Sequence, residues 1–314
     1  MNSALHPLPP GLSIVIPVYR SAPGLPQLAA RLAEVLPKCA AAHEVILVCD
    51  GGQDGESWTA VRQCAAHYPW VRGINLAKRS GQHATTLVGI RAARFDRTIT
   101  MDDDFQHPPE EIPTLLAGLT ENIDLVYGRS ATAPGGWARN LSSRGIREVV
   151  RHLHGVRHVN LITAFRALRT ALRDRFTNPH VSFGFLDLAL AWVTDRITSV
   201  QVRFEPRPVG KSSYSFLRRL SLALTVIATY SPYSLRLLFL LASGWVLLAF
   251  GTVAYMIETH SALSDQVQLL PLQTIVLISG AAVQMFMLLA IASLLAKIYL
   301  ASLGLPQAII QETC

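Results

Sequence analysis

Two long stretches without a charged residue constrain this chain more than any other feature. The runs 237–257 and 269–296 contain no Asp, Glu, Lys or Arg. A helix needs about 20 apolar residues to cross a bilayer. A pair of buried core helices is the alternative, but soluble cores rarely hold two uncharged runs of this length. We therefore expect two transmembrane helices, at 237–257 and 269–296, after a soluble domain.

The charges are distributed unevenly around these runs. From residue 237 onward the chain has one basic and three acidic residues, whereas residues 1–236 have 27 basic and 18 acidic ones, a net charge of +9. The loop between the runs has no Lys or Arg, and basic residues flank the pair: Arg218, Arg219, Arg236 and Lys297. The positive-inside rule then predicts a protein of the inner (cytoplasmic) membrane with its soluble domain, both termini and a tail at 297–314 in the cytoplasm.

The segment 214–236 connects the soluble part, residues 1–213, to the first apolar run. It is rich in Leu, Phe, Val and Ile and carries Arg218 and Arg219 near one end. Such a segment is typical of juxtamembrane amphipathic helices that lie in the membrane interface. Packing against the soluble domain is the alternative.

Short apolar runs alternate with helical patterns in the soluble part. This alternation predicts an α/β fold with a mostly parallel sheet, in which ligands bind at the carboxyl ends of the strands. We take Pro17 to end the first strand. The expected strands are 12–16, 44–49, 71–76, 98–101 and 124–127, and the expected helices are 25–36, 57–67, 84–94 and 110–119. Polar residues that follow these strands are Tyr19, Asp50, Asp102, Asp103, Asp104 and Arg129.

Three consecutive aspartates, Asp102–Asp104, follow the fourth expected strand. Side chains alternate along a strand, so Asp102 and Asp104 can point the same way while Asp103 points away from them. Two convergent carboxylates can bind Mg²⁺ or Mn²⁺ and leave positions for phosphates and water. A solvated acidic turn before a helix beginning near Pro108 is the alternative. The position at a strand end favours the metal site.

Other groups suit a phosphorylated ligand. Asp50 and Gly51 follow the second strand, where a carboxylate can bind a base or ribose and a glycine lets the backbone approach it. Arg139 and Ser143 would share one face of a helix and suit phosphate oxygens, although a solvated basic face explains them equally well. Asp187 could bind hydroxyl groups of a ligand, act as a base, or be a structural helix residue.

These residues resemble glycosyltransferase family 2 enzymes of GT-A fold over nearly the whole chain. The most specific match is the block from Thr100 to Pro113, TMDDDFQHPPEEIP. Other matching blocks are Ile14–Tyr19, Val48–Gly55, Leu76–Ala84, Gly128–Arg129, Arg139 to Ser143, Phe165–Arg166 and Arg207 to Ser215. With two spans after the catalytic domain, the chain is most similar to polyprenyl-phosphate glycosyltransferases, such as the dolichol-phosphate mannose synthase, GtrB and undecaprenyl-phosphate aminoarabinose types.

The resemblance implies a function and a set of roles. A Rossmann-like GT-A domain would transfer a sugar, with inversion, from a nucleotide sugar to undecaprenyl phosphate or another polyprenyl phosphate, for cell-envelope glycan or lipid modification. A UDP-sugar is the favoured donor and a GDP-sugar the other one. The cofactor would be Mg²⁺ or Mn²⁺, the assembly a homotetramer, and nucleic acid would not be a partner.

The implied site residues fall into four groups. Catalytic residues would be Asp104, Arg129 and Asp187. Nucleotide-binding residues would be Pro17, Tyr19, Asp50, Gly51, Lys78, Gln82, Asp102 and Asp103. Metal ligands would be Asp102 and Asp104. Residues for the acceptor phosphate would be Arg139, Ser143, Arg207, Ser212 and Tyr214.

Three other interpretations compete with this one. A processive polysaccharide synthase would carry a QxxRW motif and more spans, and neither is present in the sequence. Another membrane lipid, such as a diacylglycerol or a ceramide, could be the acceptor. A non-catalytic membrane scaffold with a degenerate GT-A domain is the third interpretation, and the intact pair of Asp102 and Asp104 argues against it.

Overall fold

A computed structural model of the chain describes residues 8–51, 55–130, 161–176, 186–205, 233–260, 270–302 and 308–314. The chain forms two compact units. The first contains the N-terminal part of the chain together with the residues from Gly304 to Cys314, and the second contains two long helices. The expected soluble domain and the expected spans thus fall into different units.

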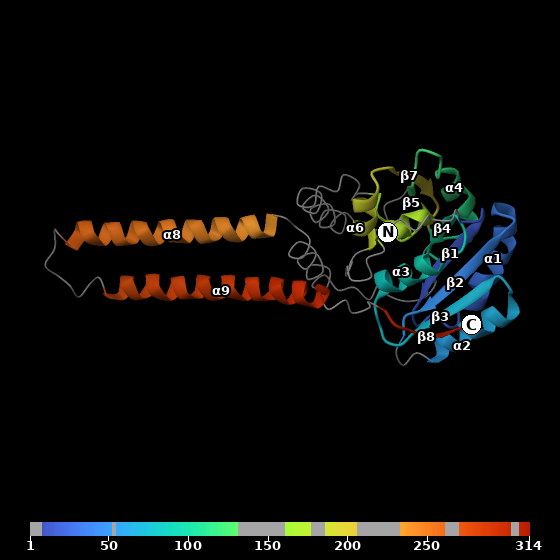
Figure 1. Ribbon diagram of the computed structural model, residues 1–314, viewed down its shortest axis with the longest axis horizontal. Helices are drawn as coiled ribbons and strands as arrows, with labels where there is room; N and C mark the ends of the chain where they lie inside the picture. Colours follow the sequence, from blue (N-terminus) through green and yellow to red (C-terminus); the bar gives the residue numbers. More distant parts are fainter. Residues whose placement is uncertain are drawn as a thin grey trace. The chain divides into compact units, whose positions relative to one another are not determined.

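The first unit is built on one eight-stranded sheet with the strand order β7-β5-β6-β4-β1-β2-β3-β8 (Figure 1). The strands β3, β2, β1 and β4 run parallel to one another, whereas β6 runs antiparallel between β4 and β5, and β8 runs antiparallel to β3. The strands are β1 (Leu12–Val18), β2 (His43–Cys49), β3 (Val71–Leu76), β4 (Arg97–Thr100), β5 (Leu125–Ser130), β6 (Arg166–Arg169), β7 (Ile197–Val202) and β8 (Ile310–Thr313). The mostly parallel α/β sheet predicted from the sequence is confirmed.

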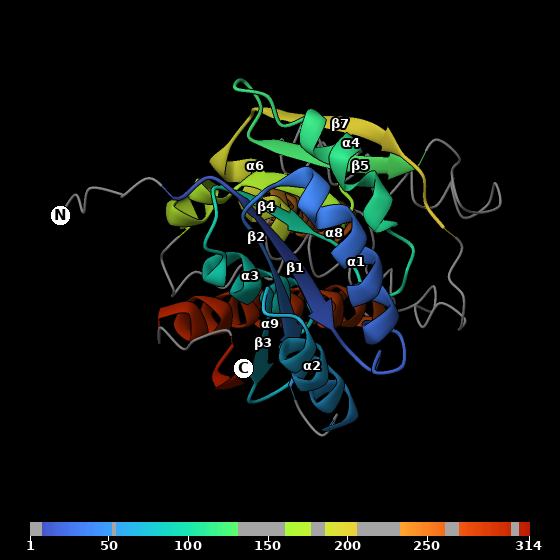
Figure 2. The same cartoon turned by 90° about the vertical axis from the view of Figure 1, so that its right-hand side faces the viewer.

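Helices cover both faces of this sheet, which is why the central strands are apolar throughout their length. One hydrophobic cluster joins one face of the sheet to α1 (Leu25–Cys39), α2 (Gly55–His67) and α4 (Ile112–Ala117). The other cluster joins the opposite face to α3 (Gln82–Ala92) and α6 (Leu186–Val193). Figure 2 shows α1, α2 and α4 in front of the sheet. The remaining short helices are η1 (Pro109–Glu111) and η3 (Thr170–Phe176).

Pro17 does not end the first strand, contrary to the sequence-based expectation. It lies inside β1, where it pairs with Val48 of β2. Its missing N–H is tolerated because the pairing of β1 with β4 ends at Val15 and Thr100, so Pro17 extends beyond that neighbour.

The second unit contains α8 (Tyr233–His260) and α9 (Leu270–Ser302), which include the two expected spans. Gly280 of α9 lies against the ring of Trp245 on α8, where a Cβ atom would come within 2.3 Å of the indole. Among the described residues, only Ser279–Ala296 is both long and apolar enough to cross a membrane, with a mean hydropathy of 1.9. The expectation of two transmembrane helices is therefore not confirmed.

The residues after α9 return to the sheet. We expected 297–314 to be a tail, but α9 continues to Ser302 and β8 pairs antiparallel with the outer edge of β3. The backbone N–H of Gly73 donates to the carbonyl of Cys314 at 2.8 Å, and the N–H of Cys314 donates back at 3.0 Å. The indole N–H of Trp58 adds a 2.8 Å hydrogen bond to Glu312. The first unit is thus completed by a strand that follows both long helices.

Candidate active site

The polar residues predicted for the site lie at the carboxyl ends of the central strands. Tyr19 follows β1, Asp50 and Gly51 follow β2, and the acidic run Asp102–Asp104 follows β4. Lys78 and Gln82 lie in or just after the loop that leaves β3. Parallel strands bring these loops to one edge of the sheet, as the sequence predicted.

Asp103 has partners in another loop, and the alternation of side chains along a strand does not apply to it, since β4 already ends at Thr100. Its Oδ2 accepts a 3.2 Å hydrogen bond from the backbone N–H of Tyr19 and another from the hydroxyl of Ser21. Burial raises the pKa of Asp103 to about 6, against the opposing effect of these two donors. Asp103 therefore ties the loop after β4 to the loop after β1.

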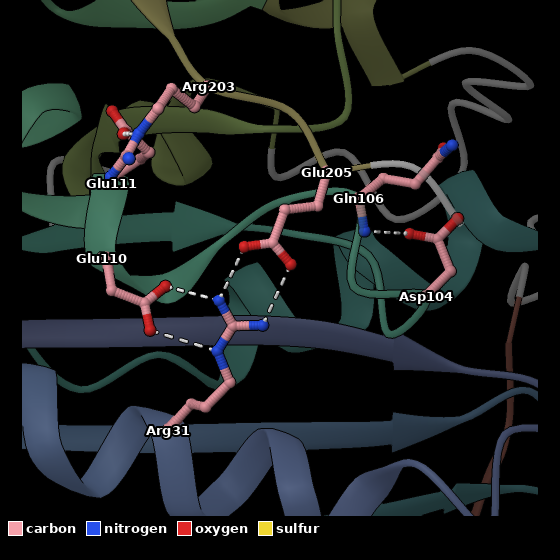
Figure 3. A network of polar contacts seen from close by, with 7 residues as sticks. All are labelled: Arg31, Asp104, Gln106, Glu110, Glu111, Arg203 and Glu205. Carbon is pink, nitrogen blue, oxygen red and sulfur yellow. Dashed lines mark hydrogen bonds and ion pairs between the residues drawn. The ribbon is translucent and has the colours of Figure 1, made fainter. Parts of the chain in front are cut away.

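Asp102 and Asp104 are both partly exposed, and each has a hydrogen-bond partner. Oδ1 of Asp102 accepts a 2.6 Å hydrogen bond from the side-chain amide of Gln82. Oδ1 of Asp104 accepts a 3.1 Å hydrogen bond from the backbone N–H of Gln106 (Figure 3). Each carboxylate is thus oriented through one oxygen by a neutral donor.

His107 fixes the start of the acidic run. Its Nδ1 accepts a 3.1 Å hydrogen bond from the backbone N–H of Asp102. The ring is stacked on Phe165, with centroids 5.1 Å apart, and meets the edge of Phe204 at the same distance. Burial lowers the pKa of His107 to about 4, so the ring is neutral at pH 7 and carries its proton on Nε2.

Asp50 organises the loop that follows β3. Its carboxylate accepts the backbone N–H of Ser80 at 2.7 Å and that of Gly81 at 3.1 Å. Next to it, Gly51 has a φ of +23°, and a Cβ there would come within 2.1 Å of the carbonyl oxygen of Leu76. A glycine is required because the two loops touch through their backbones at this point.

The guanidinium groups of Arg20 and Arg79 lie over the ring of Tyr19. The guanidinium carbon of Arg79 lies 4.4 Å from the ring centroid and that of Arg20 lies 5.4 Å away. These distances are within the range of cation–π contacts. The ring is 38% exposed, so the edge of the site carries an aromatic face together with positive charge.

Asp187 is buried inside the domain, and its partner Arg166 reaches the last residue of β4. It is 3% exposed and forms an ion pair with Arg166, which is equally buried. Its Oδ1 also accepts a 2.9 Å hydrogen bond from the hydroxyl of Tyr127, and Arg166 donates to Thr100 at 2.9 Å. The carboxylate thus joins α6 to β4, β5 and β6, which fits the structural alternative considered for this residue.

The other predicted residues are placed as follows. Pro17 lies in β1, Arg129 is exposed at the end of β5, and Lys78 and Gln82 are exposed. The residues predicted for the acceptor phosphate lie outside the described residues: Arg139, Ser143, Arg207, Ser212 and Tyr214. Their roles stay predictions.

The donor groups at the acidic run suit a hard divalent cation. Asp102 and Asp104 supply carboxylate oxygens, which Mg²⁺ and Mn²⁺ prefer. Within the described part of the chain, no group of three or more His, Cys, Asp or Glu side chains could enclose a metal ion. That arrangement fits a cation held by one or two carboxylates and completed by substrate phosphates, as is usual for Mg²⁺.

Reasoning from the sequence missed several residues that shape the site. Ser21, His107, Arg166 and Arg31 all contact the acidic run or the segments that hold it. His107 and Arg166 had a signal in the sequence, because His107 lies five residues after Asp102 in the most specific block and Arg166 lies in the matching block Phe165–Arg166. Ser21 and Arg31 meet their partners only in the folded chain, because Asp103 and Glu205 lie far from them in the sequence.

Comparisons with known proteins agree with this fold. The family model described as glycosyl transferase family 2 matches residues 13–187, more than half of the chain. The crystal structure of glucosyl-3-phosphoglycerate synthase from Mycobacterium tuberculosis, in complex with Mn²⁺, UDP and phosphoglyceric acid, is similar with a TM-score of 0.50 and 16% identity. The match covers 70% of this chain and 76% of that chain.

A second solved structure is S. aureus TarS in complex with UDP-GlcNAc. It matches with a TM-score of 0.45 and 17% identity, over 69% of this chain and 65% of that chain, which is too weak a likeness to support an inference. The match of the family model, together with the GT-A-like sheet, is sufficient to assign the chain to a family. The chain belongs to glycosyl transferase family 2 and is a glycosyltransferase.

Proposed function

We propose that this glycosyltransferase moves a sugar from a nucleotide sugar, preferably a UDP-sugar, to a polyprenyl phosphate at the cytoplasmic face of the membrane. The observation that carries this proposal is the acidic run at the end of β4, in a family 2 domain whose chain continues into long apolar helices. The first feature suits a diphosphate-bearing donor and the second suits a lipid acceptor.

The donor side of the proposal uses Asp102 and Asp104 as ligands of Mg²⁺ or Mn²⁺. When bound there, the cation would supply positive charge opposite the leaving diphosphate. Gln82 and Gln106 orient the two carboxylates through one oxygen each. Tyr19 with Arg79, and the loop held by Asp50, would form the part of the site that faces the nucleotide.

The acceptor side needs little activation. A phosphate monoester has a second pKa of about 6, so it is already largely dianionic at pH 7. An oxygen of this phosphate attacks the anomeric carbon, the bond from that carbon to the diphosphate oxygen breaks with inversion, and the nucleoside diphosphate leaves. Arg129, exposed at the end of β5, would hold one of the two phosphate groups.

The long helices support a lipid acceptor. Large apolar side chains of α9 are more than half exposed, among them Leu277, Leu289 and Ile298. Exposure of this kind is costly in water and favourable in a bilayer. The isoprenoid tail of the acceptor would remain in the bilayer, while its phosphate lies at the level of the headgroups, next to a basic cytoplasmic domain.

The experiment is sugar transfer by the full-length protein in detergent with Mn²⁺. Radiolabelled UDP-sugars and GDP-sugars are offered with undecaprenyl phosphate, diacylglycerol, ceramide or 3-phosphoglycerate, and the products are separated by chromatography. We expect a labelled polyprenyl-phosphate sugar from one of the donors. Transfer to any of the other acceptors, with none to undecaprenyl phosphate, would overturn the proposed acceptor.

Two carboxylate variants test the assignment of the site. Asp104→Asn should reduce transfer to background, because an amide is a poor ligand for a divalent cation in place of a charged carboxylate. Asp195→Asn, an exposed position before β7, is the matched control and should keep wild-type turnover. Wild-type turnover by the Asp104 variant would contradict the metal site.

A further inference from the structure

Arg31 joins two carboxylates from distant parts of the chain. Its guanidinium, on α1, donates to both oxygens of Glu110 at 3.1 and 2.7 Å, and to both oxygens of Glu205 at 3.1 and 3.3 Å (Figure 3). Glu110 lies in η1, just after the acidic run, and Glu205 lies just after β7. We refer to Arg31, Glu110 and Glu205 together as the Arg31 clasp.

The clasp is connected to the acidic run by two backbone hydrogen bonds. The N–H of Glu205 donates to the carbonyl oxygen of Gln106 at 3.1 Å. The N–H of the same Gln106 donates to Oδ1 of Asp104 at 3.1 Å, as Figure 3 shows. Glu205 therefore holds Arg31 with its side chain and the loop of Asp104 with its backbone.

The clasp is poorly suited to stabilise the domain as a whole. The side chain of Arg31 is 24% exposed and both glutamates are almost half exposed. Ion pairs between partly exposed side chains contribute little to the stability of a fold. A guanidinium that donates two hydrogen bonds to each of two carboxylates does, however, fix the orientation of both carboxylates. The reason is that its N–H donors lie in one rigid plane. Without Arg31, two like charges would remain at the end of the loop.

We propose that Arg31 is a positioning residue for the metal site. It holds Glu205, and through Gln106 it keeps Asp104 in the orientation that binds the divalent cation. The inference rests on the proposed role of Asp104 and deepens it. The same contact fixes the last residue before segment 206–232, in which three of the residues predicted for the acceptor phosphate lie: Arg207, Ser212 and Tyr214.

The test measures Mn²⁺ binding rather than turnover. Full-length protein in detergent is titrated with Mn²⁺ in the presence of UDP, and free Mn²⁺ is followed by electron paramagnetic resonance. Losing an outer partner of a metal ligand weakens metal binding about 10–100-fold. Because Arg31 acts through two further groups, we expect Arg31→Ala to raise the Mn²⁺ Kd about tenfold, at the lower end of that range.

Arg203→Ala is the matched control. Arg203 pairs with Glu111 at 2.8 Å in the same region (Figure 3), and its side chain is 82% exposed. The charge of Arg203 acts on Glu110 and Glu205, but its described hydrogen bond and ion pair are with Glu111 alone. We expect this variant to bind Mn²⁺ as the wild type does, and Arg31→Lys, which keeps the charge but not the planar fork, to fall between wild type and Arg31→Ala.

A double variant tests whether Arg31 acts on Asp104 through Glu205. If Arg31 acts through Glu205, then Arg31→Ala combined with Glu205→Gln should weaken Mn²⁺ binding no more than the stronger single variant, since both interrupt one path. A merely structural role predicts instead a lowered melting temperature of the metal-free protein and an unchanged Mn²⁺ Kd. That result, or an equal weakening by Arg203→Ala, would overturn the inference.

The inference and the proposed function can fail separately. If the wild type binds Mn²⁺ with UDP and glycosylates undecaprenyl phosphate, but Arg31→Ala binds Mn²⁺ unchanged, the inference alone is wrong. If Arg31→Ala weakens Mn²⁺ binding as expected, but no polyprenyl phosphate is glycosylated, the proposed acceptor alone is wrong.

Discussion

Asp187 occupies a buried site that it shares with two partners of different kinds. Arg166 neutralises its charge, and Tyr127 donates to the same carboxylate oxygen. Burial next to this carboxylate raises the pKa of Tyr127 well above its ordinary value, so the phenol stays protonated and remains a donor. The charges and hydrogen-bonding groups of this cluster are paired only while all three side chains are present. Removing one charge then leaves its partner buried without a counter-charge, which strongly lowers the stability of the fold.

Asp187→Asn should therefore destabilise the protein by about 3–5 kcal/mol, because it leaves the guanidinium of Arg166 buried without a counter-charge. The measurement is urea unfolding of the full-length protein followed by tryptophan fluorescence. Tyr127→Phe serves as the comparison and should cost about 1–3 kcal/mol, since it removes one hydrogen bond to a charged group. An Asn variant as stable as the wild type would contradict this account of the buried pair.

At the residue scale, the acidic run could be identified from the sequence, but its orientation could not. Three aspartates after a strand indicated a cation site, and the structure gives Asp103 partners different from those of Asp102 and Asp104. The expected cause was strand alternation, whereas the actual cause is a set of partners that the fold supplies. Ser21 and Gln82 come from other loops, and neither has a spacing relative to the run that points to it.

Among the elements, α3 shows how closely helix and sheet approach each other. Gly89 of α3 faces β1, and a Cβ atom there would come within 2.3 Å of Cγ1 of Val15 and 3.1 Å of Cγ2 of Val48. Both valines are buried, and a β-branched side chain cannot rotate away easily. The packing of α3, which begins at the edge of the site with Gln82, depends on this close contact.

Gly89→Ala should therefore lower the free energy of unfolding by about 1–3 kcal/mol through overpacking, even though alanine favours the helix by about 1 kcal/mol. Gly55→Ala is the matched control, because nothing lies within 4 Å of its added methyl group at the start of α2. We expect that variant to be neutral or slightly more stable in the same urea titration. Equal effects at the two glycines would contradict the packing argument.

The elements that could be predicted are those with strong local patterns. The strands β1 to β5 and the helices between them were expected from apolar runs and helical spacing. The strands β6, β7 and β8 were not expected. β6 has arginine at both ends, and β8 reads Ile-Gln-Glu-Thr, so neither shows the apolar pattern of a central strand. Both are held by partners that lie far away in the sequence.

At the scale of the whole molecule, the chain leaves the sheet after β7, forms α8 and α9, and then returns to the sheet as β8. Besides the pairing of β8 with β3, three further backbone hydrogen bonds join the returning segment to Gly73 and Ala77, and Trp58 adds a side-chain bond. Residues 308–314 are therefore part of the catalytic unit, although more than two hundred residues separate them from β3.

Removing residues 308–314 should destabilise the catalytic unit by more than about 3 kcal/mol, because the bonds outside the strand pairing alone contribute about 1 kcal/mol each and the pairing with β3 is lost as well. Urea unfolding of the shortened protein checks this, with Ile310→Thr as the control. Ile310 is half-exposed, and threonine retains the strand-forming shape, so this variant should unfold at nearly the wild-type urea concentration. A shortened protein of unchanged stability would show that β8 adds nothing to the sheet.

The late position of β8 also has a consequence for biosynthesis. A ribosome delivers β1 to β5 early, but the edge of β3 stays open until both apolar helices have been translated. An open, unpaired edge is where chains join wrongly or are recognised as unfinished. Closure of that edge by β8 thus marks a nascent chain that has already produced its whole apolar hairpin, and quality-control proteases could distinguish finished from interrupted molecules by this single strand.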